Sequence, residues 1–270
     1  MKRLCSVGIA AALALGLTLP AWAERIVIEG STTVLPIAQR AAEEFMDQNR
    51  NADISVRGGG SGVGITSLIE GTCHIANSSR PIKDVELEKA ISKKRDPKAH
   101  VIAMDGIAVI VNSVNPVNAL TKKQLKDIYT GKISSWSMLG GSAQPIVVVS
   151  RDSASGTFEA FAELALDKQK VRRDALMEAS NQAVASVVSK TPGAIGYVGL
   201  AYIGSGVKAL TLDGVSPSKS TVVSKQYALS RPLFMYTNGK PKGLVKDFID
   251  FVLGPQGQKL ADEEGYVSLQ

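Results

Sequence analysis

Chemically reactive side chains are scarce in this chain of 270 residues. It contains two cysteines and two histidines, and aromatic residues make up 5% of its composition. Beyond the first 23 residues the sequence has one cysteine, Cys73, which excludes an intramolecular disulfide and a cysteine-based metal site there. The low aromatic content argues against a surface on which nucleic-acid bases stack. We therefore predict no metal, no cofactor and no nucleic-acid partner.

Long hydrophobic runs are also absent, except at the N-terminus. Lys2 and Arg3 precede an apolar run over 7–19, which is too short to span a bilayer. The sequence Ala-Trp-Ala at 21–23 fits the small-x-small pattern of a cleavage site. These features predict a signal peptide over 1–23, cleaved after Ala23. We expect a soluble, periplasmic protein.

One local pattern occurs three times: a β-like run, a turn rich in Ser, Thr and Gly, and a helix-like run. The three turns are 30–33, 58–62 and 150–157. A helix N-terminus leaves backbone N–H groups unpaired and carries a partial positive charge. Hydroxyl groups add donors, and glycine lets a ligand approach the backbone. Turns of this kind, meeting at one point, would form an oxyanion site without a metal.

The alternation of strand-like and helix-like segments predicts an α/β fold on a mostly parallel sheet. The predicted helices include 34–48, 63–70, 83–93, 158–166, 181–190 and 243–253. The predicted strands include 53–57, 101–111, 145–149 and 227–236, and Met-Asp-Gly at 104–106 interrupts the second of these.

A change of character near 112–116 divides the chain. We predict one lobe that holds 24–111 and takes back 229–270, and a second lobe that holds 112–228. The chain would then cross between the lobes twice and form a hinge. In open α/β sheets, ligands bind beyond the carboxyl ends of the strands, where the three turns lie.

Enzyme motifs are not found in the sequence. The run 58–64 fits neither G-x-G-x-x-G nor G-x-x-x-x-G-K-[ST]. Ser61 and Ser155 are candidate nucleophiles, but His74 and His100 lie beside neither of them, and G-x-S-x-G is absent. We therefore predict no catalytic residue. An exported phosphatase on the same scaffold stays an alternative.

Two charged residues stand out against their surroundings. Arg151 follows an apolar strand and precedes the third turn, where its guanidinium offers a bidentate fork to an oxyanion; the alternative is a surface salt bridge to Asp152. Asp105 interrupts an apolar run, and buried carboxylates are rare without a partner. An ionised carboxylate accepts a hydrogen bond from protonated phosphate but repels sulfate, so we expect Asp105 to favour phosphate over sulfate. A binding protein for another oxyanion, such as sulfate, stays an alternative. The other reading is that Asp105 only shapes a turn or hinge.

At these residues the chain resembles the phosphate-binding proteins of the phosphate-specific ABC transporter, the PstS family. The resemblance spans nearly the whole mature chain, and its markers are specific through their joint order. They are 30–36, 58–62, 78–81, 105–112, 128–133 with Trp136, 151–157, 193–197 and 265–267. The resemblance implies a two-lobed periplasmic-binding-protein fold (type II), with mixed sheets flanked by helices and a hinge between the lobes. It also implies phosphate as ligand, an ABC permease in the inner membrane as partner, and a monomer.

The resemblance also implies which residues bind the ligand. The family's binding positions fall on Thr32, Thr33, Ser61, Arg151, Ser155, Gly156 and Thr157. Some members carry an aspartate, as the acceptor of the ligand's proton, where this chain has Ser79. At this position the chain departs from the family pattern. Relatives with a similar Met-Asp-Gly stretch point to Asp105 as the replacement, and Asp152 is the alternative acceptor.

Overall fold

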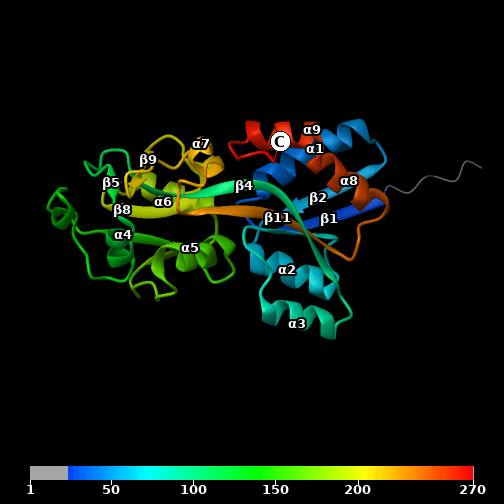
Figure 1. Ribbon diagram of the computed structural model, residues 1–270, viewed down its shortest axis with the longest axis horizontal. Helices are drawn as coiled ribbons and strands as arrows, with labels where there is room; N and C mark the ends of the chain where they lie inside the picture. Colours follow the sequence, from blue (N-terminus) through cyan, green and yellow to red (C-terminus); the bar gives the residue numbers. More distant parts are fainter. Residues whose placement is uncertain (1–23, 270) are drawn as a thin grey trace, which may run out of the picture.

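The structure is a computed structural model that describes residues 24–269. The predicted signal peptide, 1–23, lies outside the described residues. Two parts of the molecule lie side by side along its long axis, and two long strands, β4 (Pro97–Asn112) and β11 (Ser230–Asn238), pass between them (Figure 1). We call the part at the right of Figure 1 lobe 1 and the part at the left lobe 2.

Lobe 1 is formed by the N-terminal segment together with the C-terminal segment. Its elements are β1 (Glu24–Gly30), α1 (Leu35–Gln48), β2 (Ala52–Arg57), α2 (Ser61–Glu70), β3 (Ile75–Ser78), α3 (Asp84–Ser92), β11 (Ser230–Asn238), α8 (Gly243–Leu253) and α9 (Pro255–Glu263). The predicted helices 34–48 and 243–253 are confirmed as α1 and α8. Helix α9, which the sequence analysis did not predict, packs against α8 and α1.

Lobe 2 is formed by the middle of the chain. Its elements are β5 (Ala119–Leu120), α4 (Lys122–Tyr129), η1 (Trp136–Leu139), β6 (Val147–Arg151), α5 (Gly156–Leu166), β7 (Leu176–Glu178), α6 (Asn181–Lys190), β8 (Ala194–Gly199), η2 (Leu200–Tyr202), β9 (Val207–Ala209), β10 (Thr211–Leu212) and α7 (Lys219–Val223). Strand β4 (Pro97–Asn112) belongs to both lobes. It runs without a break through 104–106, so the alternative reading of Asp105 as a residue that only shapes a turn is wrong.

One mixed sheet continues through both lobes in the order β2-β1-β3-β11-β4-β8-β6-β7, with β9 also paired to β4. Strand β1 is parallel to β2 and β3, and β6 is parallel to β7 and β8. The central strands β4 and β11 pair antiparallel with each other and with their outer neighbours β8 and β3. The predicted mostly parallel sheet is therefore wrong in its centre, because these two strands carry the chain across in opposite directions. The mixed sheet that the family resemblance implies is confirmed.

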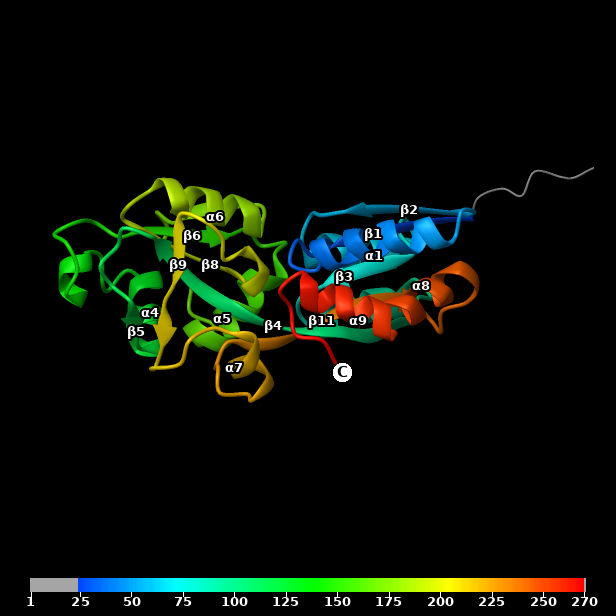
Figure 2. The ribbon, with the colours of Figure 1, turned by 90° about the horizontal axis from the view of Figure 1, so that it is seen from above.

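Each lobe has its own apolar core. Ile102 and Ala103 of β4 belong to the core of lobe 1, whereas 107–111 of the same strand belong to the core of lobe 2. The chain returns between Leu229 in the second core and Leu233 in the first. Figure 2 shows both strands passing between the lobes at one side of the molecule. The division at 111 and 229 stays a prediction.

The turns that follow β1, β2 and β6 meet between the lobes. The N–H of Gly60 donates to the carbonyl oxygen of Gly30 at 2.9 Å, within lobe 1. The N–H of Gly62 donates to the carbonyl oxygen of Ala154 at 3.0 Å, from one lobe to the other. Gly60 has φ +98°, and a Cβ there would lie 2.5 Å from that same oxygen, so this approach requires glycine. The predicted strand–turn–helix units thus converge on one place.

Candidate functional site

The site lies at the junction of the lobes, where helices begin. All nine residues predicted to bind a ligand are buried there: Thr32, Thr33, Ser61, Ser79, Asp105, Arg151, Ser155, Gly156 and Thr157. Helices α1, α2, α5 and α6 begin at or just after residues of this site. The partial positive charges of their N-termini therefore gather in one region.

The first turn places two threonine hydroxyls at the junction. Thr33 Oγ1 lies 2.9 Å from Thr157 Oγ1 of the other lobe. The hydroxyl groups of Tyr202 and Tyr266 donate to the carbonyl oxygens of Thr32 and Thr33, at 2.6 and 2.5 Å. Tyr266 comes from the C-terminal segment that the resemblance marked, and with Tyr202 it fixes the orientation of this turn.

Two serines of lobe 1 form the next part of the site. Ser61 is the first residue of α2, and its Oγ accepts a hydrogen bond from the N–H of Ser79 at 3.0 Å. The two Oγ atoms are 3.4 Å apart. Ser79 follows β3 and is fully buried, so a short hydroxyl occupies the position at which some family members have a carboxylate.

Helix α5 brings lobe 2 against these serines. Ser155 is its N-cap residue, and the Oγ of Ser155 accepts from the N–H of Phe158 at 3.1 Å. A Cβ on Gly156 would lie 2.2 Å from Ser61 Oγ and 2.8 Å from Ser79 Oγ. Only glycine therefore lets the N-terminus of α5 approach the serines this closely.

Arg151 is held firmly on two of its three nitrogens. Its Nε donates to the carbonyl oxygen of Glu178 at 3.0 Å. Its Nη2 donates to the carbonyl oxygen of Ala179 at 2.9 Å and to Thr32 Oγ1 at 3.3 Å. Its Nη1 is buried and has no hydrogen-bond partner among the described residues. The predicted alternative, a surface salt bridge to Asp152, is wrong, because Arg151 is 1% exposed and Asp152 instead accepts from the N–H of Ala154.

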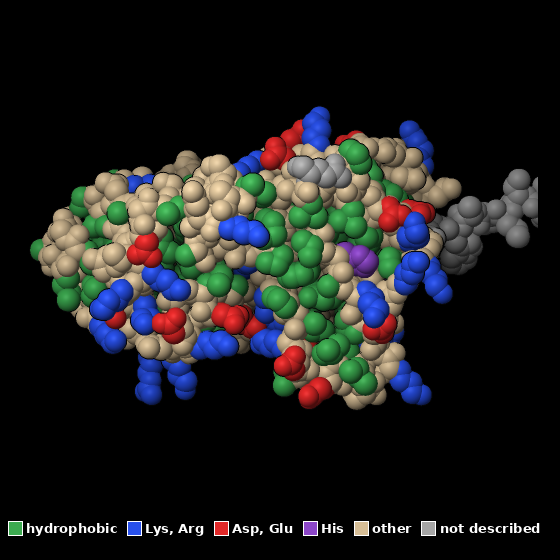
Figure 3. Space-filling view, in the orientation of Figure 1, with side chains coloured by type: hydrophobic (Ala, Val, Ile, Leu, Met, Phe, Trp, Pro, Cys, Tyr) green, Lys and Arg blue, Asp and Glu red, His purple; other side chains and the backbone are tan. Residues whose placement is uncertain are grey.

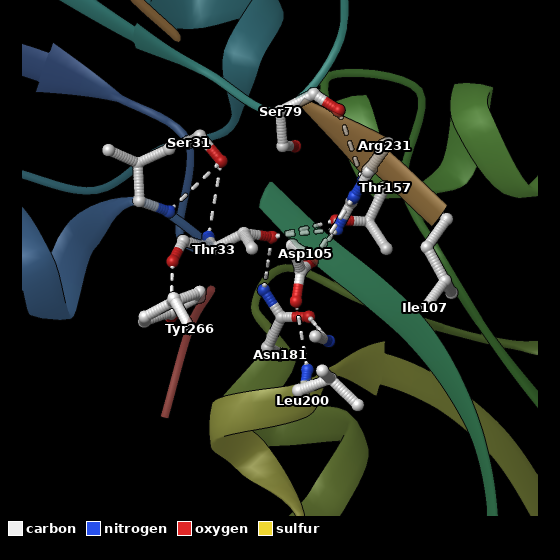
Figure 4. A network of polar contacts seen from close by, with 12 residues as sticks. Ser31, Thr33, Ser79, Asp105, Ile107, Thr157, Asn181, Leu200, Arg231 and Tyr266 are labelled. Carbon is white, nitrogen blue, oxygen red and sulfur yellow. Dashed lines mark hydrogen bonds and ion pairs between the residues drawn. The ribbon is translucent and has the colours of Figure 1, made fainter. Parts of the chain in front are cut away.

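Arg231 is a second buried guanidinium, which the sequence analysis missed. Its Nη2 donates to Asp105 Oδ2 and Thr157 Oγ1 at 3.0 Å each and to Thr33 Oγ1 at 3.3 Å, and its Nη1 donates to the carbonyl oxygen of Ser79 at 3.2 Å (Figure 4). Arg231 therefore contacts both lobes and four of the predicted residues. Its position could have indicated this role, because Arg231 is a charged residue inside the apolar run 227–236, just as Asp105 is inside the apolar run 101–111.

Asp105 is fully paired within the protein. Its Oδ1 accepts from the N–H of Leu200 at 3.0 Å, and its Oδ2 accepts from Arg231. Burial raises the pKa of this carboxyl, while the guanidinium of Arg231 opposes that change. Burial also lowers the pKa of Arg231 and of Arg151. Two buried guanidinium groups and one carboxylate leave an excess of one positive charge at the site, which favours an anion.

Asn181 is another residue of the site that was not predicted from the sequence. Its Nδ2 donates to Thr32 Oγ1 and Thr33 Oγ1 at 3.1 Å each, and its Oδ1 accepts from the N–H of Gly199. It is the first residue of α6 and follows the short strand β7, so it repeats the strand–turn–helix pattern. The strand has only three residues, which is too short to be recognised from the sequence.

The chemistry available here is hydrogen bonding and charge. The chain's two histidines lie elsewhere: His74 Nδ1 accepts from the N–H of Val27, and His100 Nε2 lies 3.0 Å from Thr237 Oγ1. Between residues 24 and 269, no group of three or more His, Cys, Asp or Glu side chains could hold a metal ion. The arrangement suits a tetrahedral oxyanion enclosed by hydroxyl, amide and guanidinium donors.

Comparison with known proteins agrees with this geometry. A model of the PBP superfamily domain matches residues 19–256. The phosphate-binding protein PstS of Bacillus subtilis (strain 168) is 37% identical over 247 residues, which cover 90% of this chain and 80% of the relative. PstS of Staphylococcus epidermidis (strain RP62A) is 36% identical over 254 residues, which cover 89% and 77%.

Two solved structures share both fold and sequence. A phosphate ABC transporter substrate-binding protein from Clostridium perfringens, with bound phosphate, is similar with a TM-score of 0.86 at 34% identity, covering 92% of this chain and 100% of that chain. An ABC-type phosphate transport receptor from Vibrio cholerae has a TM-score of 0.73 at 32% identity, covering 90% and 99%. The predicted binding-protein fold is confirmed by these similarities.

Proposed function

The chain belongs to the PstS family of phosphate-binding proteins within the PBP superfamily, and on this premise we propose that it captures one inorganic phosphate between its lobes and delivers it to an ABC permease. The observation that carries the proposal is the buried Nη1 of Arg151, which has no partner in the described residues. A guanidinium nitrogen removed from water without an acceptor is costly. A phosphate oxygen would satisfy it.

The proposed ligand set keeps eight of the nine predicted residues, all except Asp105, and adds two. Arg151 and Arg231 supply charge, the N-termini of α2 and α5 supply N–H groups, and the hydroxyls of the remaining predicted residues supply further donors. Asn181 and Arg231 are the additions, since each donates to threonines of the site. In this proposal Asp105 holds Arg231 in place. Its predicted role as acceptor of phosphate's hydrogen stays a prediction.

Closure and release follow from the two connecting strands. Predicted ligand residues come from both lobes, and the chain passes between the two cores along β4 and along the segment leading into β11. A bending motion of these strands would separate Thr33 from Thr157 and open the site. We therefore propose lobes over 24–111 plus 229–270 and over 112–228, with phosphate bound in the closed form.

Location and partners are proposed on the same basis. None of the helices in 24–269 is long and apolar enough to cross a membrane. The signal sequence supports export to the periplasm with cleavage after Ala23. The partner would be a permease of the inner membrane, and the protein itself would act as a monomer.

The test is a calorimetric titration of the mature protein after bound phosphate has been removed. We expect one site with a Kd in the micromolar range or tighter, roughly −8 kcal/mol or more favourable. A titration with sulfate gives the preference among oxyanions. A failure to bind phosphate at 1:1 stoichiometry would contradict the proposal.

A phosphatase on this scaffold is tested with p-nitrophenyl phosphate. The serine hydroxyls of the site have no imidazole beside them, because the chain's two histidines make contacts elsewhere. We expect no turnover, and steady release of p-nitrophenol by the wild-type protein but not by the Arg151→Ala variant would instead support an enzyme.

A further inference from the structure

Charged side chains of both lobes meet beside the site, across a groove of about 660 Å³. Glu159 of lobe 2 accepts at Oε1 from Lys83 Nζ at 2.7 Å, and its Oε2 lies 2.6 Å from Arg80 Nε. The same groove is lined by Ser79 and Arg231 of the site. Figure 3 shows a notch between the two lobes at the lower edge of the molecule, with basic and acidic side chains on its walls.

The lobe 1 side of this contact is fixed independently of lobe 2. Arg80 is 5% exposed and donates through both Nη atoms to the two carboxylate oxygens of Glu86, at 2.7 Å each. Glu86 Oε2 also accepts from the N–H of Lys83 at the start of α3. Burial opposes ionisation of Glu86, but these bonds outweigh it and lower its pKa. Arg80 and Lys83 thus present a formed positive surface to Glu159.

The contact is coupled to the site through the chain. Arg80 directly follows Ser79, and Glu159 lies two residues after Thr157 in the first turn of α5. Arg80 is bonded directly to Ser79, and one helical turn fixes Glu159 relative to Thr157, so neither charged residue can move far without moving its neighbour in the site. When Glu159 meets Arg80 and Lys83, the N-terminus of α5 is therefore held against Ser61 and Ser79.

We propose that Arg80, Lys83 and Glu159 form an interlobe latch that slows phosphate release from the closed protein. The proposal rests on the proposed function, and it adds residues that do not contact the anion. Opening would leave Arg80, Lys83 and Glu86 with one excess positive charge on lobe 1 and Glu159 unpaired on lobe 2. This attraction across the groove acts whether or not a ligand is bound, and it is partly shielded from solvent, since Glu159 is 19% exposed.

The test is the dissociation rate of phosphate from the variant Glu159→Gln, measured by stopped flow in the full mature protein. Loss of one partner in a partly buried ion pair acts mainly on dissociation, so we expect about a tenfold faster rate and a small change in association. If Glu159 acts only as a negative charge that repels the bound anion, the variant should instead release phosphate more slowly. Its removal would then strengthen phosphate binding, and that outcome would overturn the latch.

A matched control lies one turn away on the same helix. Glu163→Gln removes the same charge from a side chain that is 66% exposed and paired with Lys168 of its own lobe, at 3.6 Å. We expect its dissociation rate to equal that of the wild type. Added salt should accelerate release from the wild type but not from Glu159→Gln, because salt screens the latch. If Glu159→Gln does not fold, Lys83→Gln, at an exposed position, replaces it with the same expected direction.

Measurements on the ligand-free protein test the latch separately from the proposal that the protein binds phosphate. At low salt, Glu159→Gln should have a larger radius of gyration in small-angle scattering than the wild type or Glu163→Gln. Equal radii for all three proteins, with equal dissociation rates, would refute the latch. A wild type that does not bind phosphate but shows the difference in radius would refute the proposed function and leave the latch supported.

Discussion

Asp105 and Arg231 face each other as directly paired residues of β4 and β11, the two strands that join the lobes, and their side chains form a buried ion pair at 3.0 Å. The pair therefore stands where the chain crosses between the lobes. From this position Arg231 contacts Thr33 and the carbonyl of Ser79 on one side and Thr157 on the other. This ion pair therefore joins the site to the two strands that we propose as the hinge.

Arg231→Met should reduce both stability and phosphate affinity. It leaves the Asp105 carboxylate buried without its partner, which typically costs about 3–5 kcal/mol in the free energy of unfolding. The double variant Asp105→Asn/Arg231→Met should regain most of that stability in urea unfolding, but calorimetry should still show weak phosphate binding. Full recovery of affinity in the double variant would mean that Arg231 has a structural role only.

Arg151→Ala should weaken phosphate binding more than any single Ser or Thr change in the site. Hydrogen bonds to a charged group contribute about 1.5–3 kcal/mol each, against about 0.5–1.5 kcal/mol for neutral ones. The matched control is Arg25→Ala, since Arg25 is exposed and pairs with Asp53 far from the site. If both variants bind phosphate as the wild type does, the site lies elsewhere.

Gly156→Ala should weaken binding without destabilising the protein. The added methyl group would lie 2.2 Å from Ser61 Oγ, so the lobes cannot close fully, and such overpacking typically costs about 1–3 kcal/mol. We expect a Kd about 10 to 100 times higher. Helix α5 itself accepts alanine at its first residue, so the free energy of unfolding should not fall.

The control for this prediction is Gly204→Ala, because a Cβ there meets no atom within 4 Å. Calorimetry on both variants shows whether the loss of affinity comes from blocked closure of the lobes or from any added methyl group. Equal losses of affinity in the two variants would be evidence against the close approach of α5.

Asp105→Asn tests the origin of anion preference. The role predicted for Asp105 is to accept a hydrogen bond from protonated phosphate, and sulfate has no proton to donate. In the structure the carboxylate accepts instead from Leu200 and Arg231. We therefore expect the ratio of phosphate to sulfate affinity to stay unchanged in competition titrations. A shift of that ratio toward sulfate would support Asp105 as the acceptor.

Stability should fall at alkaline pH because of buried tyrosines. Burial raises the pKa of Tyr197 and of Tyr202 to about 12. In the unfolded chain such groups ionise near pH 10, so between about 10 and 12 the folded state holds more protons than the unfolded state. The stabilisation is present below pH 10 and is lost as pH rises through 12. Urea unfolding from pH 8 to 12 should show a loss of a few kcal/mol, with a shallower slope for Tyr202→Phe.

The sequence predicted the local elements of the site better than its long-range contacts. The turns at Thr32 and Ser61 and the N-terminus of α5 were recognisable because each follows a strand and begins a helix within a few residues. Arg231 and Tyr266 were missed as parts of the site because their roles depend on pairing over more than 100 residues. The continuous course of β4 was missed for the same reason: Asp105 looks like a break until Arg231 is placed opposite it.

The position of β11 between β3 and β4 has a consequence for how the molecule is made. A nascent chain that has reached residue 229 contains both β3 and β4 but not the strand that joins them. The sheet of lobe 1 stays incomplete on the ribosome until 230–238 have been synthesised, and Tyr266 fixes the turn at Thr33 later still. A chain made in this order cannot complete the sheet of lobe 1 before β11 has left the ribosome.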